Sequence, residues 1–180
     1  GLDSVEIGIG DNLLAAPWIR TLVRINKSFI VQRGLPVREM PKAFLELSGY
    51  IRHAITKKQT GVWIAQREGR AKDSNDRTQE SILKMFALSG TKSFIENLKE
   101  LNICPATISY EYDPCDYLKA KEFQQKRDNA NFKKSPQDDL LNMKTGIMGD
   151  KGHVHFTFTP SINSELEQIE VSIDNRKKQI

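Results

Sequence analysis

The first 110 residues alternate between short apolar runs and longer stretches with helical periodicity. Apolar runs of five or six residues that stop at glycine, proline or charge predict buried strands. Apolar residues that recur every three or four positions between these runs predict helices with one face against a sheet. The pattern predicts strands at residues 5–10, 29–33, 62–66 and 106–110, and helices at residues 15–25, 37–58, 78–88 and 93–101.

The remaining residues are more polar, with one strictly alternating segment at residues 153–159 that Pro160 ends. Five strands, with helices between the first four, favour an α/β fold. We expect a single domain over residues 1–180, with a mixed, mainly parallel sheet wrapped by helices. Further helices are predicted at residues 116–128 and 137–148, and from residue 165 onward.

The composition is that of a globular chain: 38% of the 180 residues are hydrophobic and 28% are charged. No apolar run approaches the ~20 residues that a membrane-spanning helix needs, and no signal peptide is visible. The two cysteines lack the spacing of a metal site, so we expect no metal and no cofactor. A reducing, cytoplasmic setting suits them.

Positive charge is concentrated in one part of the chain. Residues 18–72 hold twelve Lys or Arg against three Asp or Glu, although the whole chain carries only +4. Such a basic segment suits a phosphorylated substrate, the phosphates of CoA, an anionic membrane face or nucleic acid. Many of these charges, including Lys57 and Lys58, are expected to be solvated side chains on helix surfaces.

One charged turn follows a predicted strand directly. The apolar run from Gly61 to Ala65 stops at Arg67-Glu68-Gly69-Arg70, with Lys72 two residues further on. Glycine lets the backbone approach a ligand, and arginine offers a planar fork of donors that matches phosphate. The turn is therefore a candidate anion site, and an ordinary polar loop is the alternative.

Two other segments have a related design. Residues 27–33, Lys-Ser-Phe-Ile-Val-Gln-Arg, contain a short apolar strand that starts at Phe29, two residues after Lys27, and ends at the cation Arg33. Residues 104–112, Cys-Pro-Ala-Thr-Ile-Ser-Tyr-Glu-Tyr, place Pro105 at the start of another apolar strand. Each segment alone is a weak signal. The three segments follow one another in a fixed order.

In this order the three segments resemble three sequence blocks of the glycerolipid acyltransferase superfamily, of the glycerol-3-phosphate or 1-acylglycerol-3-phosphate acyltransferase type. The resemblance implies acyl transfer from acyl-CoA or acyl carrier protein to a glycerol-phosphate-type acceptor in phospholipid synthesis. It implies that Arg33 and the Glu68–Gly69–Arg70 turn hold the acceptor phosphate, with Arg70 or Lys72 as the second cation. Lys27 stands where the superfamily has glycine and is a further candidate for substrate binding, and Pro105 is expected to shape the acyl or pantetheine site.

The superfamily's first block, His-x-x-x-x-Asp, supplies the histidine that acts as general base. Five residues after the three histidines of this chain stand Lys58, Phe158 and Pro160, so none of the histidines matches. We therefore expect no catalytic residue within the chain, a catalytic histidine upstream of residue 1, and a fold truncated at its N-terminus. Residues 1–180 alone are expected to be inactive.

The alternative is a non-enzymatic, basic binding module for nucleic acid or an anionic membrane. That reading predicts cations spread over a broad face instead of gathered at two strand ends. Neither zinc-finger spacing nor an aromatic-basic RNA-binding pattern is present, so we expect no nucleic-acid partner. We expect a cytoplasmic protein that associates peripherally with the inner face of the membrane.

Overall fold

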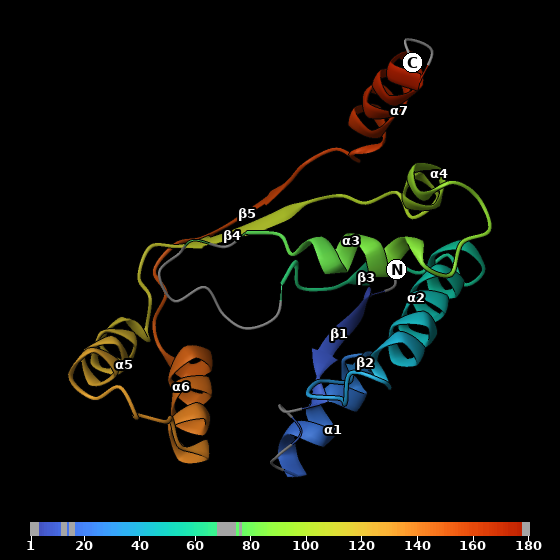
Figure 1. Ribbon diagram of the computed structural model, residues 1–180. Coiled ribbons are helices and arrows are strands. Elements are labelled where there is room, and N and C mark those ends of the chain that lie inside the picture. The colour runs from blue at the N-terminus through green and yellow to red at the C-terminus, as the bar shows by residue number, and fades with distance from the viewer. Residues whose placement is uncertain (1–3, 12–13, 15–16, 68–74, 76, 178–180) are drawn as a thin grey trace. The chain divides into compact units, whose positions relative to one another are not determined.

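The computed structural model describes residues 4–11, 14, 17–67, 75 and 77–177, which form helices and strands in a mixed α/β protein (Figure 1). The chain divides into two compact units. The first unit comprises Gly1–Ile103 and Ser161–Ile180, and the second unit comprises Cys104–Pro160. The sequence pattern alone favoured one domain, because no change of composition marks either boundary.

A three-stranded parallel sheet forms the centre of the first unit. Its strands β1 (Glu6–Gly10), β2 (Ser28–Val31) and β3 (Val62–Trp63) lie in the order β2-β1-β3. Helix α1 (Pro17–Ile25) connects β1 to β2, and α2 (Met40–Thr56) connects β2 to β3. Gly8 pairs with Phe29, and a Cβ on Gly8 would lie 3.0 Å from the Phe29 ring. The parallel arrangement predicted for these three strands is confirmed.

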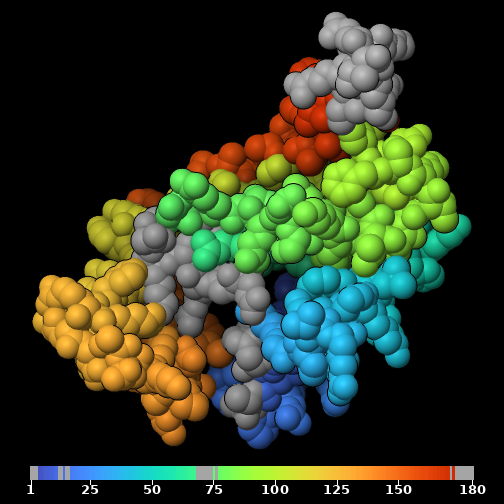
Figure 2. Space-filling view, in the orientation of Figure 1, coloured from blue at the N-terminus to red at the C-terminus, as the bar shows by residue number. Residues whose placement is uncertain are grey.

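Four helices build the core of the first unit. Alongside α2, these are α3 (Glu80–Ala87), α4 (Phe94–Lys99) and α7 (Asn163–Lys177). One side of α3 and α4 faces outward in the space-filling view (Figure 2). Among the described helices, none has the length and apolar character to cross a lipid bilayer. The buried core cluster comprises Ile51, Met85, Phe86, Ala87, Ile95, Leu98, Leu101 and Leu166.

The second unit contains a two-stranded antiparallel ribbon and two helices. Strand β4 (Ala106–Tyr110) pairs with β5 (Val154–Phe158), and the helices α5 (Asp116–Asp128) and α6 (Pro136–Met148) lie between them in the chain. The expectation that all the strands join one mainly parallel sheet is therefore wrong for β4 and β5. Cross-strand pairing explains the difference, because the apolar positions of β4 stand opposite those of β5 and give the ribbon one apolar face.

Candidate functional site

The candidate site is the edge of the parallel sheet at which its strands end, called here the carboxyl edge. Because β1 pairs in parallel with both β2 and β3, the carboxyl ends of all three strands share this edge. Asp11 follows β1, Arg33 stands two residues after β2, and residues 64–67 follow β3. Ligands of open α/β sheets bind outside the carboxyl ends of strands, so this edge suits a binding site.

The backbone fixes Arg33 at the carboxyl edge. Its N–H donates a hydrogen bond to Asp11 Oδ2, with 3.3 Å between the nitrogen and the oxygen. Gly34 follows with φ +65°, a conformation that glycine adopts without strain, and the chain turns there. Arg33 is half-buried. The ends of β1 and β2 are thus tied together with an arginine between sheet and solvent.

The connection from β3 to α3 is closed at its base by described residues. The N–H of Gln79 donates to the carbonyl of Gln66 at 2.9 Å, and Thr78 Oγ1 donates to Gln66 Oε1 at 2.9 Å. Arg67 Nη1 donates to the carbonyl of Asn75 at 3.2 Å. This connection therefore starts and returns near the end of β3.

Four predicted site residues belong to this connection: Glu68, Gly69, Arg70 and Lys72 lie outside the described residues. The strand ends that carry Arg33 and this segment share one edge, because β2 and β3 both run parallel to β1. That the guanidinium groups of Arg33 and Arg70 lie close together stays a prediction.

Lys27 lies at the other edge of the sheet. It immediately precedes β2, and its carbonyl accepts a hydrogen bond from the N–H of Ile7 at 3.3 Å. The four residues of β2 separate it from the carboxyl edge, a span of about 13 Å at the usual rise of a strand. The structure therefore does not bring Lys27 together with Arg33. The sequence shows that a cation stands at each end of β2, but the two ends of a strand lie at opposite edges of the sheet.

Pro105 belongs to the second unit. Its carbonyl accepts hydrogen bonds from the N–H of Thr159 at 3.0 Å and from Thr159 Oγ1 at 3.2 Å. Pro105 therefore closes one end of the β4–β5 ribbon, where its own missing N–H is not required for pairing. Its predicted contribution to an acyl or pantetheine site stays a prediction.

A buried carboxylate lies at the edge of the sheet at which its three strands begin, called here the amino edge. Glu6, at the start of β1, accepts hydrogen bonds from Lys58 Nζ and Tyr50 Oη, and the Lys58 ammonium lies 5.8 Å from the centre of the Tyr50 ring. The hydrogen bond from Lys58 is the largest cause that lowers the pKa of Glu6, followed by that from Tyr50, and the charge of Lys27 adds to them. The hydrogen bond with Glu6 raises the pKa of both Tyr50 and Lys58.

This cluster was missed by sequence reasoning, which treated Lys58 as a solvated surface charge. The available signal was Glu6 itself, because an acidic residue inside a short, otherwise apolar strand needs a partner once the strand is buried. The ammonium of Lys58 is therefore bound to Glu6 within the fold.

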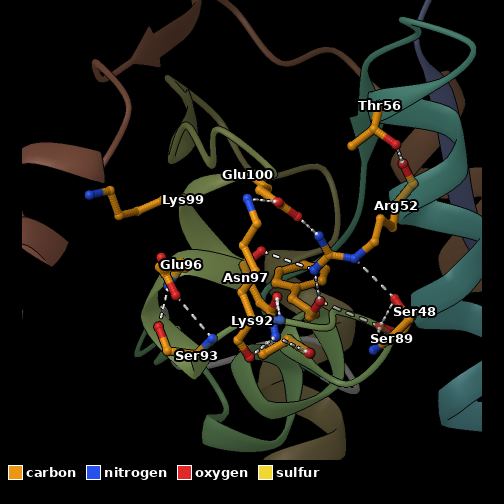
Figure 3. A network of polar contacts seen from close by, with 12 residues as sticks. Ser48, Arg52, Thr56, Ser89, Lys92, Ser93, Glu96, Asn97, Lys99 and Glu100 are labelled. Carbon is orange, nitrogen blue, oxygen red and sulfur yellow. Dashed lines mark hydrogen bonds and ion pairs between the residues drawn. The ribbon is translucent and has the colours of Figure 1, made fainter.

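Arg52 is the centre of a second structural network (Figure 3). Its Nη2 donates to the carbonyl of Asn97 at 3.0 Å, and its Nε donates to Ser89 Oγ at 3.2 Å. Its Nη1 pairs with Glu100, whose other oxygen lies 2.6 Å from Lys92 Nζ. The network joins α2 to the turn between α3 and α4. Its two cations, Arg52 of the basic segment and Lys92 outside it, therefore have a structural role.

Asn97 organises that turn. Its Nδ2 donates to the carbonyls of Ala87 at 3.2 Å and Lys92 at 3.1 Å, and its Oδ1 accepts from the N–H of Lys92 at 3.1 Å. A Cβ placed on Gly90 would lie 2.0 Å from the side chain of Asn97. Glycine is therefore required at position 90 for the buried amide to make its three hydrogen bonds.

The three histidines of the chain lie away from the carboxyl edge or in the other unit. His53 is in the last turn of α2, the end of the helix that leads to Lys58 and the amino edge. His153 and His155 belong to the second unit. Within the described part of the chain, no three His, Cys, Asp or Glu side chains gather closely enough to hold a metal ion. The carboxyl edge thus offers one described cation, the half-buried Arg33, for anion binding.

Comparison of the chain with family models, curated proteins and solved structures finds no match. Its function is therefore inferred from its own residues and from the edge at which they lie.

Proposed function

We propose that this chain carries the acceptor-binding part of an acyltransferase of the glycerol-phosphate type. The enzyme moves an acyl chain from acyl-CoA or acyl carrier protein to a hydroxyl of the acceptor in phospholipid synthesis. One observation carries the proposal: β2 and β3 flank β1 in parallel, so Arg33 and the connection that contains Glu68–Gly69–Arg70 leave the same edge. These are the two segments that resemble the superfamily's acceptor-binding blocks.

Arg33 is proposed to bind the acceptor phosphate. A guanidinium can make two parallel, charge-assisted hydrogen bonds to phosphate, and half-burial strengthens them by excluding part of the water. The hydrogen bond from the Arg33 N–H to Asp11 holds the backbone in place before the ligand arrives. Arg70 or Lys72 supplies the second cation, and Glu68 organises the turn. Lys27, at the amino edge, is left out of this site.

The reaction itself requires no covalent enzyme intermediate. A histidine takes the proton of the acceptor hydroxyl, the oxygen attacks the thioester carbonyl, the carbon–sulfur bond breaks, and the thiol leaves with a proton. The proposal assigns this role to none of the three histidines of residues 1–180, since His53 lies toward the amino edge and His153 and His155 belong to the second unit. Holding the acceptor by its phosphate orients its hydroxyl, and orientation supplies much of the rate enhancement. Such an enzyme works on lipid products, which suits peripheral association with a membrane.

The activity is tested by following thiol release from acyl-CoA with glycerol-3-phosphate, in the natural polypeptide that carries these residues. Arg33→Ala is expected to lower kcat/KM for the acceptor by roughly ten- to hundred-fold while the KM for acyl-CoA stays unchanged. Arg33→Lys should recover part of the loss, because lysine keeps the charge without the fork. Arg38→Ala, at an exposed arginine, is the matched control.

Two results would contradict the proposal. One is turnover of ~1 per second or faster by residues 1–180 alone, since the account assigns them no general base. The other is an effect of Arg33→Ala no larger than that of Arg38→Ala. Equal, small and equally salt-dependent effects at all basic positions would favour the non-enzymatic basic binding module instead.

A further inference from the structure

Helix α1 exposes an apolar stripe. Trp18, Leu22 and Ile25, here called the α1 stripe, are 51%, 46% and 73% exposed. Their spacing of four and three residues places them on one face of the helix. Ile19 is the buried residue of α1, so the helix packs on the protein through a different face. Large side chains thus stand in a row facing solvent.

The sequence that contains the stripe carries positive charge. Residues 17–37 contain four cations and no acidic residue. Arg20 and Arg24 lie one turn apart on α1 and both are exposed, on the side of the helix away from the stripe. Arginine stems can extend along a helix so that the charged heads reach a plane beside its apolar face. The helix therefore combines an apolar face with two cations on its opposite side.

We propose that the α1 stripe docks onto an anionic lipid bilayer, with α1 lying in the plane of the interface. A helix with an apolar face containing tryptophan and a basic opposite face is the type that inserts its apolar side at the level of the headgroups. Each nearby cation adds attraction to anionic lipid. Arg20 and Arg24, with no acidic residue on α1, favour such a lipid surface over a second copy of the same basic helix. The inference stands on α1 alone and does not depend on acyl transfer.

The test is flotation of the full chain with vesicles of neutral phosphatidylcholine, or of phosphatidylcholine with about 30% phosphatidylglycerol. Binding is expected only to the anionic vesicles and should weaken at about 0.5 M salt. Leu22→Gln should reduce the partition coefficient roughly ten-fold. The double variant Arg20→Gln/Arg24→Gln should reduce it roughly ten- to thirty-fold. Leu45→Gln, at a leucine of α2 that is 51% exposed, is the matched control and should bind like the wild type.

Quenching of tryptophan fluorescence by brominated lipid gives a second readout, which Trp18→Phe should abolish and Trp63→Phe should not. Thermal unfolding shows whether each variant is folded. Equal loss of binding in Leu22→Gln and Leu45→Gln, or equal binding to neutral and anionic vesicles, would overturn the proposal. So would a dimer in sedimentation that Leu22→Gln dissociates without any vesicle binding, because the stripe would then be an interface between copies.

Discussion

Basic residues have different roles on the α2 side of the first unit, which carries Arg52 and Lys58, and at the carboxyl edge of its sheet, which carries Arg33. On the α2 side, the charged ends of Arg52 and Lys58 bond to Glu100 and Glu6 within the fold. At the carboxyl edge, the contact that fixes Arg33 is made by its backbone N–H and not by its guanidinium. Substitutions on the α2 side should therefore change stability, whereas substitution of Arg33 should change ligand binding.

The largest loss of stability is expected from Gly90→Ala. Its Cβ would overlap the buried side chain of Asn97, which must move and lose hydrogen bonds in the turn next to Arg52. We expect about 3 kcal/mol less free energy of unfolding in urea denaturation. Gly49→Ala, in α2 with open space around its Cβ, is the control and should stabilise by up to ~1 kcal/mol. Similar values for the two variants would show that the Gly90 contact is not tight.

Arg52→Met should have the next largest effect. It keeps an apolar stem but removes the hydrogen bonds to Ser89 and Asn97 and the pairing with Glu100. We expect a loss of about 2–3 kcal/mol, because the side chain is largely buried and its acceptors stay behind. The same substitution at exposed Arg38 should stay within about 0.5 kcal/mol. If Arg52→Met lowered the free energy of unfolding no more than Arg38→Met, the network would not contribute to stability.

Glu6→Ala should cost about 2 kcal/mol in the same denaturation measurement. The substitution leaves the ammonium of Lys58 and the hydroxyl of Tyr50 without their shared carboxylate. Glu46→Ala provides the control, since Glu46 pairs with Lys42 across an exposed face of α2 at 3.9 Å and should contribute little. If Glu6→Ala were as mild as Glu46→Ala, the amino-edge cluster would be no more than a surface contact.

The cluster also predicts a limited pH range of full stability. The pKa of Glu6 is lowered by its hydrogen bond with Lys58, so its contribution is present above the unfolded pKa of about 4.3 and is lost as the pH falls through the folded pKa. The pKa values of Tyr50 and Lys58 are raised by their hydrogen bonds with Glu6. Their contributions are present below about pH 10 and are lost as the pH rises through their folded pKa values.

Thermal unfolding across the pH range should therefore show a plateau from about pH 5 to 9 in the wild type. Glu6→Gln should flatten part of the acid limb. It should not remove that limb, because hydrogen bonds from Lys92 and Lys119 also lower the pKa of Glu100 and Asp113. An acid limb of Glu6→Gln with the wild-type steepness would refute the role given to this carboxylate.

Local sequence patterns predicted the positions of helices and strands better than they predicted which strands pair. The helix predicted at residues 116–128 was found with those bounds, and Pro41 places the start of α2 at Met40, inside the broader range that the periodicity suggested. The strand predicted at residues 62–66 pairs only over Val62–Trp63. The spacing of apolar residues along one helix or strand determines which of its faces is apolar, so the sequence of that segment alone is enough to predict it.

Pairing across long sequence separations could not be predicted in the same way. The apolar alternation of β4 suits a parallel or an antiparallel neighbour, and its partner β5 lies more than 40 residues away in the chain. Charge has the same limitation: Lys27, Arg33 and Lys58 look alike in a charge count, yet two belong to the amino edge and one to the carboxyl edge. The direction of the strands separates them.

Binding of the acceptor phosphate by Arg33 can be measured by calorimetric titration of the full chain with glycerol-3-phosphate. We expect binding that glycerol does not reproduce, and an affinity at least ten-fold lower in Arg33→Ala with an unchanged unfolding temperature. Glu6→Gln, measured below its unfolding temperature, should bind like the wild type. Affinity for glycerol-3-phosphate that is unchanged in Arg33→Ala but lost in Glu6→Gln would show that Arg33 does not bind the phosphate.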